Sequence, residues 1–319
     1  MKTRRTRVAV IGGGQNCEYE VSLASAAAAA AALDPARYDV VALTIGVDGA
    51  WRDGRERSVG LAAAVEVLRG CDVALPLVHG LRGEDGTLAA LFDLAGVPYV
   101  GSGLAAGAVA MDKWVTKLVA QAIGIATAPG VLLTTATAAT YAWTHPVVVK
   151  PVSAGSSLGV TLVDRGGRLA AALDAALAVD RRVLVEDVVE GREVDLAVLA
   201  RPGGTRMVAP ALEIVVAGGL FDYATKYDGS AVFRVPAPLD GADRKALERA
   251  ALATYDALGC RGVARVDFFL TADGPVLNEV NTTPGFTSQS QVPRMFAAAG
   301  IAYPELLDTL ISDALAARS

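Results

Sequence analysis

Strand-like runs rich in β-branched residues alternate with alanine-rich helical stretches through the first hundred residues. The runs RVAVIG, DVVALTIG and DVALPLVHG are separated by helices expected over residues 21–33 and 59–69. This β-α-β-α-β order predicts a mostly parallel sheet with helices on both faces. A further helix over residues 86–95 leads to PYVGSG, so we expect a domain boundary near residue 101.

The rest of the chain mixes helices and short strands, which predicts two α+β units. Strands are expected at GVLLT, HPVVVKP, GVTLVD and RVLVED, and later at EVDLAVLA, ALEIV and VFRVPAPL. The helices are expected near 104–110, 112–122, 167–179 and 241–258, with a closing helix from about 303. We therefore predict three domains, an α/β unit over residues 1–101, a small central α+β unit over 102–185 and a C-terminal α+β unit over 186–319.

Composition excludes several classes of protein. The 319 residues are 53% hydrophobic and 20% charged, which is enough for large cores. A net charge of −5 gives no general affinity for nucleic acid. No signal peptide follows the basic start, and the apolar run from Ala24 to Leu33 is too short to cross a bilayer. We therefore expect a cytoplasmic protein that binds neither nucleic acid nor membrane.

The few cysteines and histidines narrow the chemistry of any metal site. Three widely spaced cysteines favour a reducing compartment and argue against a disulfide framework or a structural zinc site. Only two histidines are available, so a histidine-based centre is also disfavoured. Any bound metal is expected to be held by oxygen atoms.

Polar side chains interrupt two strands that should form a hairpin near the C-terminus. The segment ARVDFFL, the turn TADG and the segment LNEVNTTPGF place Arg265 and Asp267 on one strand and Glu279 and Asn281 on the next. Side chains alternate along a strand, so each pair shares one face. Carboxylate and amide oxygens are ligands for Mg²⁺. The alternative is a buried network in which Arg265 pairs with Asp267 and Glu279.

A loop rich in glycine and serine follows a buried strand that ends in lysine. In VVVKPVSAGSSLGV, residues 147–160, Lys150 ends the strand and Ser156 and Ser157 lie in the loop. Backbone N–H groups and hydroxyls of such a loop can hold phosphate oxygens. The segment does not match the G-x-x-x-x-G-K-[ST] pattern. An ordinary turn is the alternative.

Three further loops carry polar residues that could line a site. LVHGLRGEDGTL places His79 and Glu84-Asp85 at the end of a strand, where Asp85 could equally cap a helix. In QNCEYEVSL, Glu18 is either a charge at a helix start or an anchor for a ligand's ammonium group. LFDYATKYDG contains Lys226 and Tyr227 in a loop that could close over a site. A surface hydrophobic contact is the alternative for that loop.

Taken together, these motifs resemble the D-alanine–D-alanine ligases of the ATP-grasp superfamily. The resemblance runs across nearly the whole chain, and its order and spacing are specific. It implies a three-domain ATP-grasp fold with ATP held between the central and C-terminal domains. The segments that carry it are GGGQNCEYEVSL, LVHGLRGEDGTL, PYVGSG, AMDKWVTK, VVVKPVSAGSSLGV, VLVEDVVEGREV, DYATKY, GVARVDFFL and NEVNTTPGFTSQS.

The resemblance implies residues that bind the nucleotide and its metal ions. Lys113 and Lys150 would contact the phosphates and the adenine side of ATP. The adenine-binding segment would run from Glu186 through Val188 to Val189, and Glu193 would contact the ribose. Asp267, Glu279 and Asn281 would coordinate two Mg²⁺ ions, for which Mn²⁺ is an expected substitute.

The resemblance also implies how two amino acids are joined. The ammonium group of the first D-alanine would pair with Glu18, near His79, and its carboxylate would attack ATP to give an acylphosphate. Lys226 and the loop with Ser156 and Ser157 would hold the transferred phosphate. The second amino acid would bind through its carboxylate, and its amine would attack the acyl carbon. The residues implied at the site of the second amino acid are Arg265, Ser290 and Gln291. The Gly285 N–H and Arg265 would stabilise the oxyanion. Glu18, Ser156 and Tyr227 would form a hydrogen-bonded triad.

Three positions depart from the usual pattern of the family. Asn16 replaces a commoner serine, Tyr19 replaces histidine or arginine, and Gln291 stands where leucine or methionine is usual. An amide beside the second substrate could bind a hydroxyl or carbonyl. A related ligase with another acceptor, such as D-serine or a specialised-metabolite building block, therefore remains an alternative. Tyr227 argues against a ligase that uses D-lactate.

The leading prediction is a homodimeric ligase that makes D-alanyl-D-alanine for peptidoglycan and hence for the cell wall. A non-catalytic nucleotide-binding protein is a third alternative. Such a binder needs no group that stabilises an oxyanion or a transferred phosphate, so the presence of Arg265 and Lys226 argues against it.

Overall fold

The first unit of the chain is a parallel sheet flanked by helices. The computed structural model describes residues 4–215 and 232–317. The sheet has the order β3-β2-β1-β4, in which β1 pairs in parallel with β2 and β4, and β3 is an antiparallel edge strand. The predicted parallel sheet is confirmed, and the short β3 was not expected. The elements are β1 (Thr6–Gly13), α1 (Tyr19–Ala32), β2 (Tyr38–Ile45), β3 (Trp51–Asp53), α2 (Gly60–Arg69), β4 (Val73–Pro76) and α3 (Thr87–Ala95).

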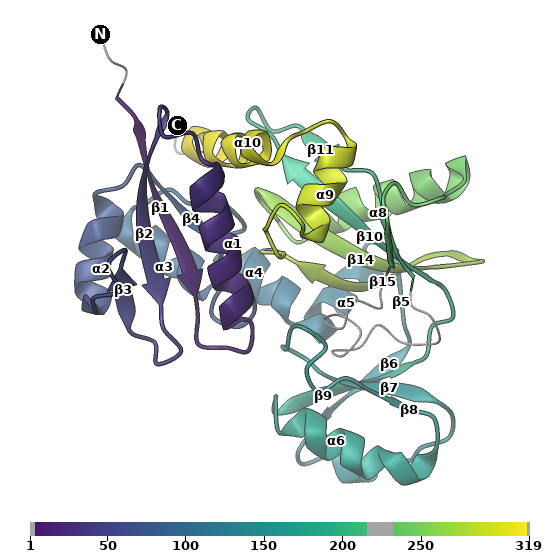
Figure 1. The fold of residues 1–319 in the computed structure, drawn as a ribbon. Helices are drawn as coiled ribbons and strands as arrows, with labels where there is room; N and C mark the ends of the chain where they lie inside the picture. Colours follow the sequence, from purple (N-terminus) through teal and green to yellow (C-terminus); the bar gives the residue numbers. More distant parts are fainter. Residues whose placement is uncertain (1–3, 216–231, 318–319) are drawn as a thin grey trace.

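A small antiparallel sheet with one main helix forms the central unit, at the lower right of Figure 1. Its strand order is β6-β9-β7-β8. The helix α6 covers one face, where Leu173 and Ala176 pack with Val149 and Val183 in a core of their own. The elements are β6 (Gly130–Thr134), η1 (Ala138–Thr140), β7 (Val147–Pro151), β8 (Thr161–Val163), η2 (Gly166–Arg168), α6 (Leu169–Leu177) and β9 (Arg182–Asp187).

A seven-stranded sheet forms the third unit. Its main path is β13-β12-β10-β14-β15-β5, with β11 paired to β10. The strands are β5 (Ala126–Thr127), β10 (Arg192–Ala200), β11 (Arg206–Val208), β12 (Leu212–Val215), β13 (Val232–Arg234), β14 (Val263–Thr271) and β15 (Gly274–Asn281). The helices that accompany it are α4 (Leu104–Met111), α5 (Lys113–Ala122), α8 (Gly241–Ala257), α9 (Gln291–Ala298) and α10 (Tyr303–Ala316).

One face of this sheet is apolar and covered by helices. Leu196, Val266 and Val280 lie opposite one another on β10, β14 and β15 and pack against Leu247 and Tyr255 of α8. Residues of α4 and α5 join the same core, and β5 pairs with β15 at the sheet edge. The structure therefore groups residues 104–127 with the C-terminal sheet, although the sequence division at residue 102 assigned them to the central unit.

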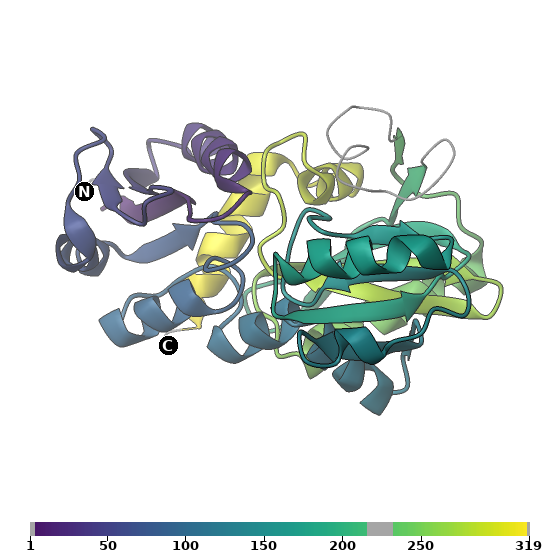
Figure 2. The ribbon, with the colours of Figure 1, turned by 90° about the horizontal axis from the view of Figure 1, so that it is seen from below.

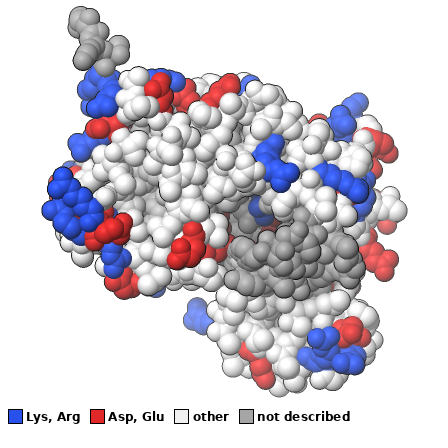
Figure 3. All heavy atoms as spheres, in the orientation of Figure 1, with Lys and Arg blue, Asp and Glu red and all other residues white. Residues whose placement is uncertain are grey.

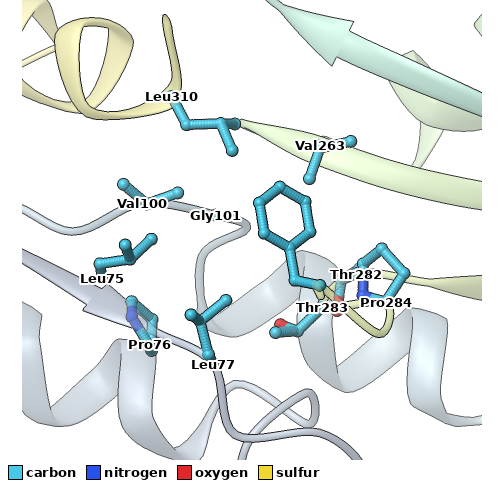
Figure 4. A pocket seen from close by; sticks show the side chains of 11 residues that line it. Leu75, Pro76, Leu77, Val100, Gly101, Val263, Thr282, Thr283, Pro284 and Leu310 are labelled. Carbon is cyan, nitrogen blue, oxygen red and sulfur yellow. The ribbon is translucent and has the colours of Figure 1, made fainter. Parts of the chain in front are cut away.

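The first and third units share one hydrophobic core. Val10 of β1 and Leu75 of β4 pack in the same cluster as Phe296 of α9 and Leu307 of α10. Figure 2 shows α10, in yellow, running between the two units. A cavity of only about 20 Å³ remains at this junction, where Leu75, Val263 and Leu310 face the turn at residues 282–284 (Figure 4). That turn is thus supported from behind by a closely packed interior.

The surface carries charges of both signs. On the face drawn in Figure 3, acidic and basic side chains form small groups with uncharged surface between them, many near the edge of the molecule and some near its middle. Within residues 4–215 and 232–317, no helix has the length and apolar character needed to cross a membrane.

Candidate active site

A cleft of about 800 Å³ opens among the three units, a size typical of small-molecule sites. Every predicted site residue within the described ranges lines it. The two other predicted residues, Lys226 and Tyr227, lie outside the described residues. Those that line the cleft are Glu18, His79, Lys113, Lys150, Ser156, Ser157, Glu186, Val188, Val189, Glu193, Arg265, Asp267, Glu279, Asn281, Gly285, Ser290 and Gln291.

The register of the C-terminal hairpin explains why its polar residues converge. Arg265 lies opposite Asn281, and Asp267 lies opposite Glu279, so all four side chains share the face that borders the cleft. The predicted convergence is confirmed. The register shifts between Asp267 and Phe268, and Asn278 is the extra residue on β15. Such a bulge re-aims side chains, and here both Asn278 and Glu279 line the cleft.

A row of three carboxylates crosses this face of the sheet. Asp195 of β10 lies opposite Asp267 of β14, which in turn lies opposite Glu279 of β15. Asp195 is 1% exposed and lies in the otherwise apolar run DLAVLA of β10, and the sequence analysis did not select it. Its place beside Asp267 follows from strand order, which local sequence does not encode.

Arg265 balances the negative charge of this row. Its Nε and Nη2 atoms donate to the two oxygens of Asp267 at 2.7 and 2.6 Å, a two-point contact. Burial by itself lowers the pKa of Arg265, but the charge and hydrogen bonds of Asp267 outweigh burial and raise that pKa above its usual value. The guanidinium is therefore positively charged at any physiological pH.

The oxygen donors on this face suit a hard cation that keeps other ligands. Asp267 also accepts from the amide nitrogen of Asn281 at 3.0 Å, and Glu279 lies 3.1 Å from the Nζ of Lys113. Among the described residues, no group of three His, Cys, Asp or Glu side chains forms a complete metal site. Two carboxylates and an amide oxygen match Mg²⁺, which usually takes one or two carboxylates together with water and substrate phosphates.

A buried cluster of two lysines and one glutamate lies where the central unit meets the third. Lys150 Nζ is 2.5 Å from Glu186 Oε2 and 3.2 Å from the Oδ1 of Asn278. Lys117 Nζ bonds the other oxygen of Glu186 and also the backbone oxygen of Ala128. Burial raises the pKa of Glu186, but Lys150 and Lys117 outweigh burial and hold that pKa below its usual value.

Sequence reasoning missed Lys117. It lies four residues after Lys113 on α5, so both side chains project from the same face of the helix. This four-residue spacing from Lys113 is the sequence signal that could have identified Lys117. Lys117 and Lys113 are both buried, at 3% and 8% exposure, so neither belongs to a solvated helix face, and Lys113 lines the cleft.

The serine-containing loop approaches the first unit closely. Ser156 donates its hydroxyl to Glu18, and both Ser156 and Ser157 adopt left-handed backbone angles, with φ of 51° and 55°. A Cβ atom at Gly155 would lie 2.8 Å from Glu18 Oε2, so a larger residue there would displace the Glu18 carboxylate. Asn16 holds the other side of Glu18, because its Oδ1 accepts from the Glu18 backbone N–H at 2.8 Å.

Side chains of the first unit bind both ends of the Thr283–Phe286 turn. Glu84 accepts from the Thr283 N–H at 3.1 Å, and the Oγ of Ser25 accepts from the Phe286 N–H at 3.1 Å. His79 contacts the Thr283 carbonyl through Nδ1 and Ser25 through Nε2. Because a carbonyl only accepts, Nδ1 carries the proton, and the Ser25 hydroxyl donates to Nε2. The predicted residue His79 thus holds the turn that contains Gly285.

Burial shifts the pKa values of two titratable groups in this contact, His79 and Glu84. Burial lowers the pKa of His79 below its usual value, against the effect of its bond to Thr283 and of the nearby Glu18 charge. Burial and the charge of Glu18 raise the pKa of Glu84 to about 8. Both groups are therefore mainly neutral at pH 7, which suits side chains enclosed between two units.

Ser290 and Gln291 lie where α9 begins. Ser290 is the residue before the helix, and its Oγ accepts from the Thr287 N–H at 3.0 Å. Gln291 is the first helical residue, and its Oε1 accepts from Nη1 of Arg265 at 2.7 Å. The sequence analysis did not expect α9, although it did select both of these residues.

Comparison with known proteins places the whole chain among related sequences. Residues 7–63 and 55–102 match the family described as "D-ala D-ala ligase N-terminus", and residues 120–312 match "D-ala D-ala ligase C-terminus". A D-alanine–D-alanine ligase of Mycobacterium sp. (strain KMS) is 40% identical over 362 residues, covering 99% of this chain and 98% of the relative. That of Mycobacterium tuberculosis (strain CDC 1551 / Oshkosh) is 40% identical over 361 residues, covering 99% and 97%.

Solved structures agree with these matches. The VanG D-Ala:D-Ser ligase from Enterococcus faecalis has a TM-score of 0.85 and 34% identity, covering 98% of this chain and 100% of that chain. The D-alanine–D-alanine ligase from Bacillus anthracis complexed with ATP has a TM-score of 0.81 and 30% identity, covering 98% of each chain.

Proposed function

The chain belongs to the D-alanine–D-alanine ligase family, and from this premise we propose which residues of the cleft carry out the ligation. It is an ATP-dependent ligase that forms the D-alanyl-D-alanine dipeptide for peptidoglycan precursor synthesis. The observation that carries the residue assignment is the convergence of Arg265, Asp267, Glu279 and Asn281 on one face, beside Lys113.

ATP lies between the central sheet and the C-terminal sheet in this proposal. The Lys117–Glu186–Lys150 cluster supports it, because Glu186 begins the segment that runs from β9 to β10 through Val188 and Val189. Glu186 is held in one orientation by two ammonium groups, so the backbone beside it is a fixed surface for the adenine. Lys113 and Lys150 face the phosphates, and Glu193 on β10 faces the ribose.

Divalent cations act at the hairpin. Asp267, Glu279 and Asn281 would hold two Mg²⁺ ions, with Mn²⁺ as a substitute. The oxygens of Asp267 also accept from Arg265 and Asn281, and Glu279 pairs with Lys113. Bound Mg²⁺ neutralises phosphate charge that otherwise repels an approaching carboxylate.

The first step activates one D-alanine. Its ammonium group pairs with Glu18, which Ser156 and Asn16 hold in place. A carboxylate oxygen of this D-alanine bonds to the γ-phosphorus of ATP as the bond to the bridging oxygen breaks, which gives an acylphosphate and ADP. The loop with Ser156 and Ser157 holds the transferred phosphate, together with Lys226. On family resemblance we assign Tyr227, which lies outside the described residues, to a triad with Glu18 and Ser156.

The second step forms the peptide bond. The carboxylate of the second D-alanine binds Arg265 and Ser290, and its amine, after losing a proton, attacks the acyl carbon. The bond from that carbon to the phosphate oxygen then breaks, and inorganic phosphate leaves. Arg265 and the Gly285 N–H stabilise the intermediate oxyanion, usually a large catalytic contribution. The bonds from Glu84, His79 and Ser25 to the flanking backbone support this use of Gly285.

The assignment is tested with purified protein, ATP, Mg²⁺ and D-alanine. ADP, phosphate and dipeptide should appear in equal amounts. Arg265→Ala should abolish dipeptide formation while ATP binding persists, and Arg249→Ala, an exposed position on α8, should leave turnover unchanged. Turnover of Arg265→Ala within about tenfold of the parent protein would remove Arg265 from the oxyanion role.

A polar acceptor such as D-serine is the second candidate, suggested by the amide of Gln291 in the cleft. Supplying D-serine or D-lactate together with D-alanine, and identifying the products by mass spectrometry, separates the candidates. We also propose, on family resemblance, that the chain acts as a homodimer in the cytoplasm. Light scattering at assay concentration should give twice the mass of the chain.

A further inference from the structure

The guanidinium of Arg265 is held by two carboxylates and one amide. Asp267 accepts hydrogen bonds from Nε and Nη2, and the Oε1 of Gln291 accepts one from Nη1. Asp195 adds a second negative charge, with its Oδ2 atom 3.6 Å from Nε of Arg265. These contacts leave the guanidinium little freedom to rotate, because they reach three of its nitrogen atoms from different sides.

Gln291 connects Arg265 to Asp195. Its Oε1 accepts from Arg265 at 2.7 Å, and its Nε2 donates to Oδ2 of Asp195 at 3.1 Å. The charges fix this orientation of the amide. Turning the amide over would place its NH₂ group against a cation and its oxygen against an anion. Leucine or methionine at this position could make neither bond.

Burying the carboxylate of Asp195 costs free energy, and the residue has a specific position in this arrangement. Its side chain is 1% exposed, and a buried carboxylate is tolerated when it is paired and hydrogen-bonded. The strand β10 places it next to Asp267, on the face that borders the cleft. The beginning of α9 supplies Gln291 from the other side. The amide thus joins the start of a helix to the central strands of the sheet at the Arg265 guanidinium.

We propose that Asp195 and Gln291 are positioning residues, which together hold Arg265 in the orientation that receives the second D-alanine. The polar side chain at position 291 serves Arg265 and does not select the side chain of the acceptor. This inference rests on the proposed role of Arg265 in binding the acceptor's carboxylate. It assigns a function to Asp195 and gives a physical reason for glutamine where an apolar residue is usual in the family.

The first test is Gln291→Leu, assayed by ADP release over a wide range of D-alanine concentration and fitted with separate constants for the two D-alanines. The KM for the second D-alanine should rise tenfold or more, while those for ATP and the first D-alanine stay within twofold. Gln121→Leu is the matched control, because it removes the side-chain bond from Gln121, an exposed residue of α5, to Thr127 of β5. Equal changes in all three constants would overturn the proposal.

The same variant separates positioning from direct recognition. With D-alanine and D-serine supplied together, Gln291→Leu should keep the ratio of the two dipeptides found for the parent protein, within about twofold. A loss of D-serine product alone would mean that Gln291 binds the acceptor's side chain, and the proposal would be wrong.

An exchange of the two groups tests whether Asp195 and Gln291 act as a pair. Gln291→Glu alone places two carboxylates together and should impair binding of the second D-alanine. Asp195→Asn combined with Gln291→Glu restores one carboxylate and one amide, with a donor again facing an acceptor. This double variant should bind the second D-alanine at least tenfold better, measured as its KM, than Gln291→Glu alone. A double variant no better than Gln291→Glu would show that the two positions act independently.

Failure of this inference is distinct from failure of the ligase assignment. A parent protein that forms no dipeptide would contradict the ligase assignment itself. A parent protein that forms dipeptide, with Gln291→Leu retaining its KM for the second D-alanine, would contradict only the positioning role. Thermal melting of each variant shows whether it is folded.

Discussion

The Nδ1 atom of His79 donates a hydrogen bond of 2.7 Å to the backbone oxygen of Thr283, 204 residues further along the chain. The bond joins the first unit to the turn that carries Gly285. With Ser25 and Glu84 it holds both sides of that glycine's peptide N–H. The first unit therefore contributes to the reaction through the backbone of the third, as well as through Glu18.

Replacing His79 by leucine should lower kcat by about 10- to 100-fold, because small misplacement of an oxyanion donor is costly. The dissociation constant for ATP, measured by calorimetry, should change by less than about twofold. Tyr38→Phe is the control, since it removes another side-chain bond to the third unit, from Tyr38 to Asp308, far from the cleft. An unchanged kcat in His79→Leu would show that the turn keeps its position without this bond.

Glu84 should make stability depend on pH. Its pKa is raised to about 8 in the folded chain, from an ordinary value near 4.5. Between these values the folded state holds a proton that the unfolded chain releases, so the free energy of unfolding falls as pH rises through this window. Glu84→Gln, which mimics the protonated acid, should lose less stability in urea between pH 5 and pH 8. Identical pH profiles of the two proteins would contradict the raised pKa.

Lys117 should matter for nucleotide binding. Lys117→Met leaves Glu186 with Lys150 as its remaining ammonium partner in the cluster, so the KM for ATP should rise about tenfold. Removing one partner of a buried ion pair should also cost roughly 3 kcal/mol of stability. The exposed Lys245→Met on α8 provides the control. If ATP binds equally well to both variants, the cluster has no part in the adenine site.

Glu279 should set the requirement for Mg²⁺. Removing divalent cations with a chelator should stop ADP release, and adding Mg²⁺ should restore it. In Glu279→Gln, the Mg²⁺ concentration for half-maximal rate should rise by at least about tenfold, because an amide is a weaker ligand than a carboxylate. Glu66→Gln, on the exposed surface of α2, should titrate like the parent protein. A matching titration for Glu279→Gln would exclude it as a ligand.

Much of the fold was predictable because each long element has a clear local signature. Alternating apolar residues identified β14 and β15. The bulge at Asn278, which has no local sequence signature, brings Asp267 opposite Glu279 and Arg265 opposite Asn281. Glu279 and Asn281 were detectable because ionisable and amide groups stand out in an otherwise apolar strand. For the same reason Lys150, at the end of VVVK, could be selected.

The residues that sequence analysis missed depend on contacts between distant segments. Asp195 acquires its role from the pairing of β10 with β14, and Lys117 from a contact with Glu186, 69 residues later. The two-residue β5 is too short to show a period of its own. It exists because the edge of β15 offers backbone partners. In α9, Pro293 and the polar residues before it obscured the helical pattern.

The division of the hydrophobic interior has a consequence for how nucleotide enters. One core runs without interruption from β1 to α10, whereas the β6-β9-β7-β8 sheet and α6 pack around a separate core. Displacing the first unit would expose buried apolar surface to water. Moving the small sheet would rotate the two strand connections at residues 128–129 and 188–191 and break polar contacts, such as that of Lys117 with Glu186 and that of Ser156 with Glu18. We therefore expect the small sheet, rather than the first unit, to move when ATP enters and ADP leaves.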